Sequence, residues 1–181
     1  MIILTTDEIK RSMLKDQEDG IDEDLLEDLE KGLIDDAEHY IGRYIKYGTY
    51  EEIQSGGTEG KDTIFLKGIK IWELKKVKIR DIEQSLDNYT IIPDLQAVYC
   101  ENRFPSGLWN IYVQYVAGYS IKEQGKEAPE GLKRALIDEI VLRYDYLQGE
   151  SRTGESLVDL KKNFLSVRSE RYFNTLRRIC L

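Results

Sequence analysis

The feature that most constrains the fold is the order in which hydrophobic periodicity changes along the chain. Apolar residues recur at helical spacings of three and four near both ends, whereas the middle carries short runs of β-branched and aromatic residues. Strands and helices do not alternate, which argues against a doubly wound nucleotide-binding fold. The order favours an α+β fold, in which N- and C-terminal helices form a bundle and a small antiparallel β-sheet is inserted between them.

The N-terminal segment, residues 1–47, carries two predicted helices. Thr5 and Glu8 have the spacing of a capping box, which predicts a short helix over about 6–14. After a polar loop, apolar residues at spacings of three and four predict a long amphipathic helix over about 22–46. The opposite face of this helix is acidic and holds Asp24, Glu27, Asp28, Asp35 and Glu38.

The middle segment, residues 48–120, has the composition of a β-rich insertion. Residues 48–62 are rich in glycine, threonine and glutamate and lack apolar periodicity, so we expect a loop there. Short β-branched and aromatic runs then predict strands at 63–66, 77–80, 89–92, 97–100 and 109–117. The last run alternates most clearly and places Trp109 and Tyr115 on the same face. Together these runs predict one small antiparallel sheet over about 63–119.

The C-terminal segment, residues 121–181, carries two further predicted helices that complete the bundle. Pro129 stands where the first turn of a helix tolerates its missing N–H, and the apolar spacing after it predicts a helix over about 130–148. The apolar stripe of this helix needs the long N-terminal helix to cover it. Ser156, followed three residues later by an aspartate, resembles a helix cap, and we expect a last, basic helix from there to about residue 178.

Two loops carry residues that ligand sites also use, and neither has the spacing that such a site requires. The acidic stretch 16–27 places Gly20 at the fifth position, whereas a calcium loop needs glycine at the sixth. The glycine-rich stretch 55–60 is followed by Lys61, but Asp62 and a strand come next instead of the hydroxyl residue and helix of a phosphate-binding loop. We therefore expect a solvated loop in the first place and a flexible loop in the second.

Other reactive residues form no recognisable constellation. His39 is the single histidine and has no cysteine near it, so a helix-surface residue is the simplest interpretation. Cys100 and Cys180 are too few and too widely spaced for a disulfide scaffold or a metal knuckle, which favours a reducing compartment. We predict no catalytic, cofactor or metal site. No apolar run approaches the roughly 18 to 20 residues that cross a bilayer, so we expect a soluble intracellular protein without membrane contact.

The uneven distribution of charge is more informative than any single motif. The chain of 181 residues has a formal net charge of -8, which argues against a surface that grips nucleic acid phosphate as a whole. Residues 1–40 hold fourteen acidic and four basic residues, whereas residues 156–181 hold six basic and two acidic ones. The two ends can pair within one chain, or they can meet head to tail between subunits and close a ring. The residues alone leave both interpretations open.

Several stretches, taken in order, resemble the head-tail connector, or adaptor, proteins of tailed bacteriophages. The most specific are a strand ending in Tyr115-Val-Ala-Gly-Tyr119 and a helix starting with Pro129-Glu-Gly-Leu-Lys-Arg-Ala-Leu. The Thr5-Thr-Asp-Glu-Ile-Lys helix and the end of the long helix also match, so the resemblance covers most of residues 1–148. The long β insertion and the basic tail depart from shorter members of the family.

The resemblance implies a structural protein of the virion and no enzyme. Members of the family assemble as a ring, typically a dodecamer, beneath the portal after genome packaging. There they extend the DNA channel and present a surface for stopper or tail-completion proteins. The resemblance implies a location in the neck between capsid and tail, a stay in the host cytoplasm during assembly, and passage of DNA during ejection without specific binding.

The resemblance also suggests which residues meet which neighbour. The C-terminal residues assigned in this way to portal binding are Arg168, Arg171, Tyr172, Arg177 and Arg178. The acidic face of the long helix is assigned to the channel lumen or to a neighbouring subunit.

Three other interpretations compete with the adaptor. The closest is a different neck component, such as a stopper or tail-completion protein. A nucleic-acid-binding module would use the basic C-terminal helix, and salt-dependent binding to duplex DNA would distinguish it from a connector. An enzyme would need converging polar groups in a pocket, and the sequence offers no recognisable set of them.

Overall fold

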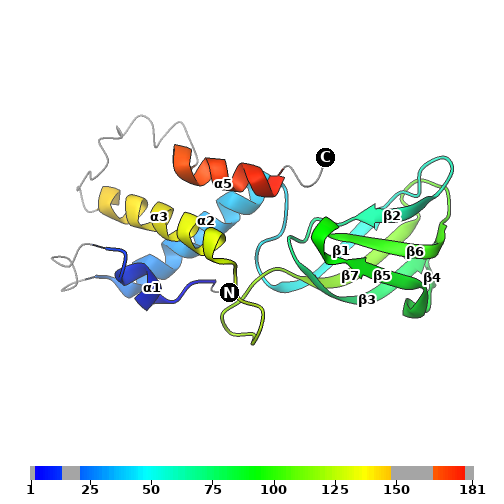
Figure 1. Ribbon diagram of the computed structural model, residues 1–181, viewed down its shortest axis with the longest axis horizontal. Helices are drawn as coiled ribbons and strands as arrows, with labels where there is room; N and C mark the ends of the chain where they lie inside the picture. The colour runs from blue at the N-terminus through cyan, green and yellow to red at the C-terminus, as the bar shows by residue number, and fades with distance from the viewer. Residues whose placement is uncertain (1–2, 14–20, 148–164, 178–181) are drawn as a thin grey trace. The chain divides into compact units, whose positions relative to one another are not determined.

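The computed structural model describes residues 3–13, 21–147 and 165–177 (Figure 1). The fold is α+β, as the order of periodicities predicts. The chain divides into two compact units, a β unit formed by Arg43–Gly118 and a helical unit formed by the residues on either side of it. Each unit buries its own set of apolar side chains.

The described helices are α1 (Thr6–Lys10), α2 (Glu23–Ile41), α3 (Glu130–Leu147) and α5 (Val167–Arg177). The predicted capping box is confirmed, because the Thr5 hydroxyl accepts the Glu8 N–H and the Glu8 carboxylate accepts the Thr5 N–H. The helix predicted after Pro129 is confirmed as α3. None of the helices in the described ranges combines the length and the apolar character needed to cross a membrane.

Helix α2 ends at Ile41, earlier than the predicted end at about 46. Gly42 follows with a φ of 70°, in the left-handed region, and its N–H donates to the carbonyl oxygen of Glu38 at 2.9 Å. A glycine in this conformation terminates a helix. The apolar spacing continues past it to Tyr44, and for that reason periodicity alone placed the end too late.

The last helix begins later than predicted. Residues 148–164, which include the predicted cap at Ser156, lie outside the described residues. Leu165 and Ser166 are not helical, and α5 begins at Val167. The Ser166 hydroxyl accepts the N–H of Ser169 at 3.3 Å, so Ser166 caps this helix. A continuous helix through residues 165 and 166 is therefore wrong.

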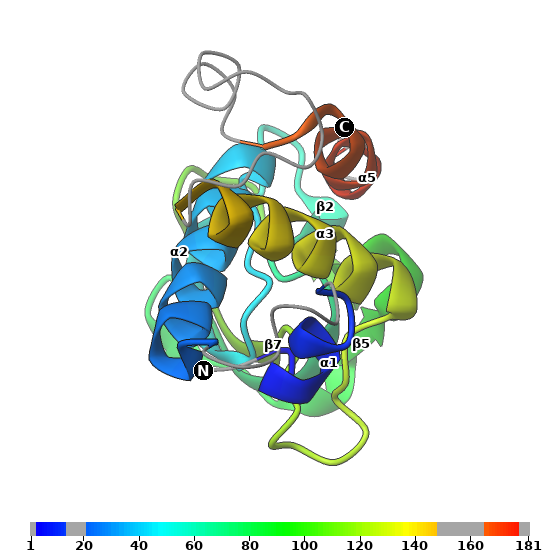
Figure 2. The same ribbon diagram turned by 90° about the vertical axis from the view of Figure 1, so that its left-hand side faces the viewer.

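The core of the helical unit forms where α2 packs against α3, as predicted, and α1 and α5 each contact both of these helices (Figure 2). Burying a large aliphatic or aromatic side chain contributes roughly 1.5–3 kcal/mol, so this core supplies most of the unit's stability. Its buried side chains include Leu26, Leu33, Ile34, Ala37, Leu132, Leu136, Ile140, Tyr144 and Phe173.

The β unit contains two antiparallel sheets instead of the single predicted one. The first has the strand order β1-β7-β3-β4 and the second β2-β6-β5. The strands are β1 (Gly48–Gln54), β2 (Lys61–Phe65), β3 (Ile71–Ile79), β4 (Ile82–Glu83), β5 (Tyr89–Ile92), β6 (Ala97–Phe104) and β7 (Ile111–Ala117). Side chains from both sheets form one buried cluster, which includes Ile64, Val98, Phe104, Val77 and Val113.

Strand β1 occupies the first seven of the fifteen residues predicted as a loop at 48–62, so that prediction is wrong for them. It pairs with β7 along its whole length, from Gly48 opposite Ala117 to Gln54 opposite Ile111. The sequence pattern does not predict this strand, because the buried side chain in its middle is a glutamate, Glu52. An inward-facing carboxylate breaks the apolar alternation by which strands are recognised.

A polar contact in the β unit joins this glutamate to Tyr115, the first residue of the strand motif Tyr115–Tyr119. The Tyr115 hydroxyl donates to the Glu52 carboxylate and accepts the N–H of Gly68 at 3.1 Å. The Lys67 N–H also donates to Glu52, at 2.8 Å. Burial and the adjacent Glu52 carboxylate raise the pKa of Tyr115 far above its ordinary value. The contact joins β1, β7 and the segment before β3 inside the unit.

Trp109 does not belong to the strand in which the alternation placed it. Strand β7 begins at Ile111, and Trp109 has a φ of 51° and is 74% exposed. Tyr115, predicted on the same face, is fully buried. A tryptophan in the left-handed region cannot continue a β-strand, so Trp109 does not lie on the face of the sheet that the alternation predicts.

Candidate assembly surface

The acidic face predicted on α2 is partly neutralised by its own helix. Asp24 and Asp28 are exposed. The Lys31 ammonium lies 3.3 Å from the carboxylate of Asp28 and 3.6 Å from that of Glu27. The hydrogen bond to Asp28 raises the pKa of Lys31. Asp35 is also exposed, and Glu38 is half-buried in the last turn.

Several N-terminal acids pair with basic side chains of other helices in the helical unit, Glu23 with Lys10 of α1 and two further acids with α3. Glu8 lies 2.9 Å from the ammonium of Lys133, and Asp36 lies 2.9 Å from the guanidinium of Arg143. Arg143 also approaches Glu139, which is buried. Part of the acidic N-terminal charge is thus matched within the chain, by basic side chains of α1 and α3.

Helix α5 is fixed to the helical unit by specific contacts. The Tyr40 hydroxyl lies 3.0 Å from a carboxylate oxygen of Glu170 and 3.1 Å from the amide oxygen of Asn174. The Ser169 hydroxyl donates to the carbonyl oxygen of Ala135 at 3.2 Å, and Phe173 is fully buried. Burial and the Glu170 carboxylate raise the pKa of Tyr40. The helix is therefore a packed element of the unit.

Four of the five residues predicted to bind a portal lie on this helix, in different environments. Arg171 is exposed, whereas Tyr172 is half-buried with its ring against Gly131 of α3. The guanidinium of Arg177 lies 5.8 Å from the centre of the Tyr40 ring, within range of a cation–π contact. Arg168 lies in the first turn of α5, and Arg178 lies outside the described residues.

Most of the large apolar side chains that are exposed among the described residues belong to the β unit, and sequence reasoning missed them. A contiguous exposed apolar surface typically marks a protein contact. The exposed residues of this unit are Ile53, Phe65, Ile82, Leu95, Tyr99, Leu108 and Trp109. Leu108 is 78% exposed, the largest fraction among them.

One group lies on the outer face of the three-stranded sheet. Val98 points into the core cluster, and its neighbours Ala97 and Tyr99 lie on the opposite side of β6, where Tyr99 is exposed and Ala97 is fully buried. The register sets Phe65 and Ile92 on either side of Ala97, with Tyr99 one position further along the same face. Leu95 lies in the turn that joins β5 to β6. We call Phe65, Ile92, Leu95 and Tyr99 the apolar sheet face.

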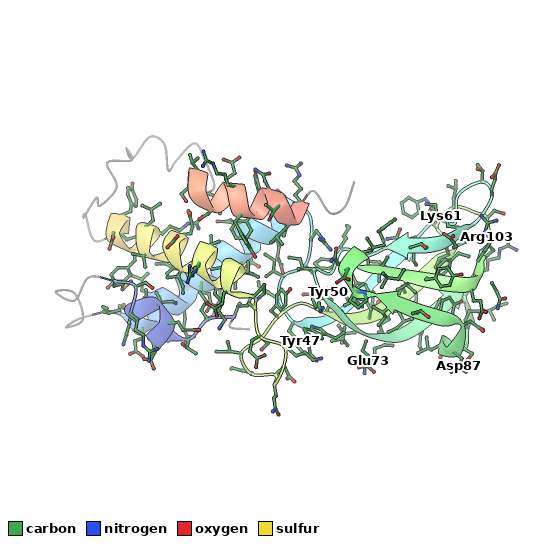
Figure 3. The ribbon with its side chains drawn as sticks, viewed as in Figure 1. Tyr47, Tyr50, Lys61, Glu73, Asp87 and Arg103 are labelled. Carbon is green, nitrogen blue, oxygen red and sulfur yellow. The ribbon has the colours of Figure 1, made fainter. Side chains whose placement is uncertain are left out.

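The other group lies on the loop between β6 and β7, which packs tightly against the loop between β1 and β2. A Cβ atom on Gly56 would lie 1.8 Å from the carbonyl oxygen of Pro105, and one on Gly60 would lie 2.5 Å from that of Phe104. No other residue permits so close an approach of two backbones. Gly56 and Gly60 therefore allow the two loops to pack closely. Figure 3 labels Lys61 and Arg103, which flank these loops, at one end of the β unit.

Hydrogen bonds hold the same loops in one conformation. The Trp109 N–H donates to the Ser55 hydroxyl at 2.9 Å, and the Gly107 N–H donates to the carbonyl oxygen of Gly57 at 2.8 Å. The Asn110 side-chain amide donates to the carbonyl oxygens of Pro105 and Ser106, each at 3.1 Å. These bonds fix the backbone on either side of Leu108 and Trp109, which we call the Leu108–Trp109 projection.

Titratable and sulfur-containing residues offer no alternative site in the part of the chain that the structure describes. There, histidine, cysteine, aspartate and glutamate side chains form no group of three or more that could hold a metal ion. Cys100 is a free thiol buried in the core cluster of the β unit.

Comparison with solved structures identifies chains of the same fold. One chain in the neck of an empty GTA particle, determined with C6 symmetry, matches with a TM-score of 0.64 at 12% sequence identity, over 94% of this chain and 88% of that one. A chain in the neck of a native GTA particle, determined with C12 symmetry, matches with a TM-score of 0.57 at 9% identity over the same shares.

A third match lies in the virion of a native gene transfer agent (GTA) particle. Its TM-score is 0.58 at 11% identity, over 92% of this chain and 86% of that one. No protein-family model and no curated protein matches the chain. At such low identities, the likeness concerns the fold.

Proposed function

We propose that this protein is a structural component of the neck of a phage-like particle. The observation that carries the proposal is the fold, which this chain shares over at least 92% of its length with chains of GTA necks and virions. A packed α5 and an exposed apolar surface on the β unit are features of a protein that works through contacts with other proteins.

Within the neck, we assign the protein the role of the adaptor, a ring of twelve subunits beneath the portal. The motifs ending at Tyr119 and starting at Pro129 support this assignment, as does the C12 symmetry of one of the similar necks. The ring would extend the DNA channel and offer its other side to stopper or tail-completion proteins. A net charge of -8 per subunit suits a channel through which DNA must slide without being held.

The exposed side of α5 is the part of the predicted portal-binding set that remains available for contact. Arg171 is exposed, whereas Tyr172 is half-buried and packs within the helical unit. On α2, the exposed acids Asp24, Asp28 and Asp35 stay assigned to the lumen or to a neighbouring subunit.

Electron microscopy of the protein with and without a portal ring tests the proposal. We expect rings of twelve subunits attached to one end of the portal, with the density of α5 nearest to it. The absence of rings in both samples would contradict the proposal. A six-fold ring that ignores the portal would instead favour a different neck component, such as a stopper.

A charge reversal on α5 tests the portal-binding face more cleanly than a truncation, because removing the helix would also remove the buried Phe173. We expect Arg171→Glu to weaken portal binding in a pull-down about tenfold or more, since charged contacts at interfaces are worth a few kcal/mol. Arg134→Glu makes the same charge change at an exposed position of α3 and is the matched control. Equal binding by both variants would remove α5 from the portal interface.

A further inference from the structure

We propose that the Leu108–Trp109 projection of one copy packs against the apolar sheet face of the next copy in the ring. The inference rests on the proposed function, since it names the contact through which neighbouring subunits of the neck component meet. It concerns the β unit alone and assigns the partner as a second copy of this chain.

The projection exposes the kind of side chain that proteins normally cover. Trp109 is 74% exposed and Leu108 is 78% exposed, although tryptophan contributes more than most residues when it is buried at an interface. Trp109 also has a φ of 51°, a region that bulky side chains avoid. Neither the exposure nor the backbone conformation helps the unit to fold. Residues held in this way are typical of functional positions.

The loops hold the projection ready for contact. The close approach at Gly56 and the hydrogen bonds of Trp109, Gly107 and Asn110 leave the backbone of the projection one conformation. A partner that covers it therefore need not order the loop first, and this lowers the entropic cost of binding.

The apolar sheet face is suited to receive a tryptophan and a leucine. Phe65 is 55% exposed, Leu95 is 49% exposed and Tyr99 is 37% exposed, so the face offers two aromatic rings and an aliphatic side chain. Aromatic rings pack favourably against one another beyond the area that they bury, and the Tyr99 hydroxyl can stay hydrated at the rim.

A second copy of the chain is the occupant that the observations favour. A head-to-tail contact repeated around a ring uses two different surfaces of the same chain, and the β unit carries both a projection and a face of matching chemistry. The necks that share this fold have C6 and C12 symmetry, in which identical copies meet in that way. Two side chains cover much less than the roughly 800 Å² per partner that a stable pair needs. The contact is thus one anchor among several that ring closure brings together.

Cross-linking between differently marked copies tests the contact. Full-length chains that carry Cys180→Ser and Leu108→Cys are mixed with chains that carry Cys180→Ser, Phe65→Cys and a mass tag. Each mixture is treated with a short bis-maleimide at a protein concentration on the order of 1 mM, where weak contacts are populated. Glu73→Cys, at an exposed position of β3 labelled in Figure 3, replaces Phe65→Cys as the matched control.

We expect the tagged and untagged chains to form a cross-linked pair at least fivefold more abundantly than the Glu73→Cys control. Neither single variant should form pairs with itself. Cross-linking of Leu108→Cys chains to each other would overturn the proposal in favour of a two-fold contact, and yields equal to the control would overturn it outright. If electron microscopy shows twelve-fold rings while the cross-link is absent, only this inference fails; the absence of rings is the failure of the proposed function.

Discussion

The two units of the molecule bury carboxylates in similar ways but differ in how many large apolar side chains they expose among the described residues. The helical unit places its carboxylates where basic partners or backbone N–H groups meet them, as at Glu8, Asp36 and Glu30. The β unit likewise buries a carboxylate that accepts a backbone N–H, Glu52, but among the described residues it leaves more large apolar side chains, such as Trp109, in solvent than the helical unit does. Many charged side chains of the helical unit therefore stabilise that unit, whereas the exposed apolar side chains of the β unit do not stabilise theirs.

The largest expected effect concerns the end of β7, where the β unit tolerates only glycine. Gly118 has a φ of 88°, and a Cβ atom there would lie 1.9 Å from the carbonyl oxygen of Lys46. We expect Gly118→Ala to destabilise the β unit by about 3 kcal/mol or more, because both the backbone conformation and the space forbid a side chain. Urea unfolding followed by tryptophan fluorescence measures it, since both tryptophans lie in this unit.

Gly57→Ala is the matched control for this substitution, because Gly57 lies in the same unit. Gly57 has a similar φ of 74°, but a Cβ atom there would meet only the flexible Lys61 side chain, whose Cε lies 3.5 Å away in ordinary van der Waals contact. The control should cost about 1 kcal/mol, the price of the left-handed conformation alone. Equal effects of the two substitutions would show that the close approach to Lys46 does not constrain the unit.

A smaller effect is expected where the β unit keeps its buried carboxylate. Tyr115→Phe removes the hydroxyl that donates to Glu52 and accepts the Gly68 N–H. Leaving buried polar groups without a partner costs about 1–3 kcal/mol, and we expect the urea midpoint of the fluorescence transition to fall accordingly. Tyr112→Phe, on the outer face of the same strand, should change the stability by less than about 0.5 kcal/mol. If the two variants unfold alike, the polar contact does not stabilise the unit.

How far the sequence predicts these features depends on whether neighbours along the chain determine them. Helix α3 was predicted almost to the residue, because Pro129 and a helical spacing are local signals. The pairing of Glu8 with Lys133 joins positions 125 apart, and that of Asp36 with Arg143 joins positions 107 apart. Such pairs follow from the packing of α1 and α2 on α3, and no spacing along the chain predicts them.

The apolar surface of the β unit was missed for a related reason. Alternation assigns Trp109 to the same face of a strand as Tyr115, but a backbone φ of 51° turns the residue out of the strand. The tight contact at Gly56 produces this loop, and it involves a carbonyl oxygen of Pro105. The one local signal was the turn sequence Ser106-Gly107 before Leu108, which argues against a strand that starts at Trp109.

The pH dependence of stability in the helical unit tests a buried carboxylate, Glu30, that accepts hydrogen bonds from backbone N–H groups. Glu30 is buried and accepts the N–H groups of Ile3 and Leu4 at 2.7 and 2.8 Å. Burial raises the pKa of Glu30 above its ordinary value, so the folded state holds the proton more tightly than the unfolded state does. This contribution to stability is complete below the ordinary pKa and is lost as the pH rises through the folded pKa.

Glu30→Gln keeps an oxygen to accept both N–H groups but does not ionise. We expect thermal unfolding of the helical unit, followed by circular dichroism, to show a smaller loss of stability between pH 4 and pH 7 in the variant, a difference on the order of 1 kcal/mol or less. Asp24→Asn, at an exposed position of the same helix, is the control for a changed net charge. An unchanged pH dependence in Glu30→Gln would mean that this carboxylate is ionised at no cost in the folded state.

The smallest effect on folding is expected at the Leu108–Trp109 projection, where one substitution tests whether an exposed apolar side chain of the β unit serves folding or assembly. Glycine adopts a φ of 51° without strain, and Trp109 buries little of its ring, so Trp109→Gly should leave the stability of the β unit unchanged or raise it by up to about 1 kcal/mol. Trp72, whose indole N–H donates to the carbonyl oxygen of Gly118 at 2.6 Å, remains to report unfolding by fluorescence.

If the Trp109 side chain is used between subunits, the same variant should assemble into rings at least tenfold less efficiently on electron microscopy grids. A substitution that preserves folding while it removes assembly separates the two roles of the surface. A clear loss of stability would instead show that Trp109 stabilises its own unit. The charged helices would then be favoured as the subunit contact.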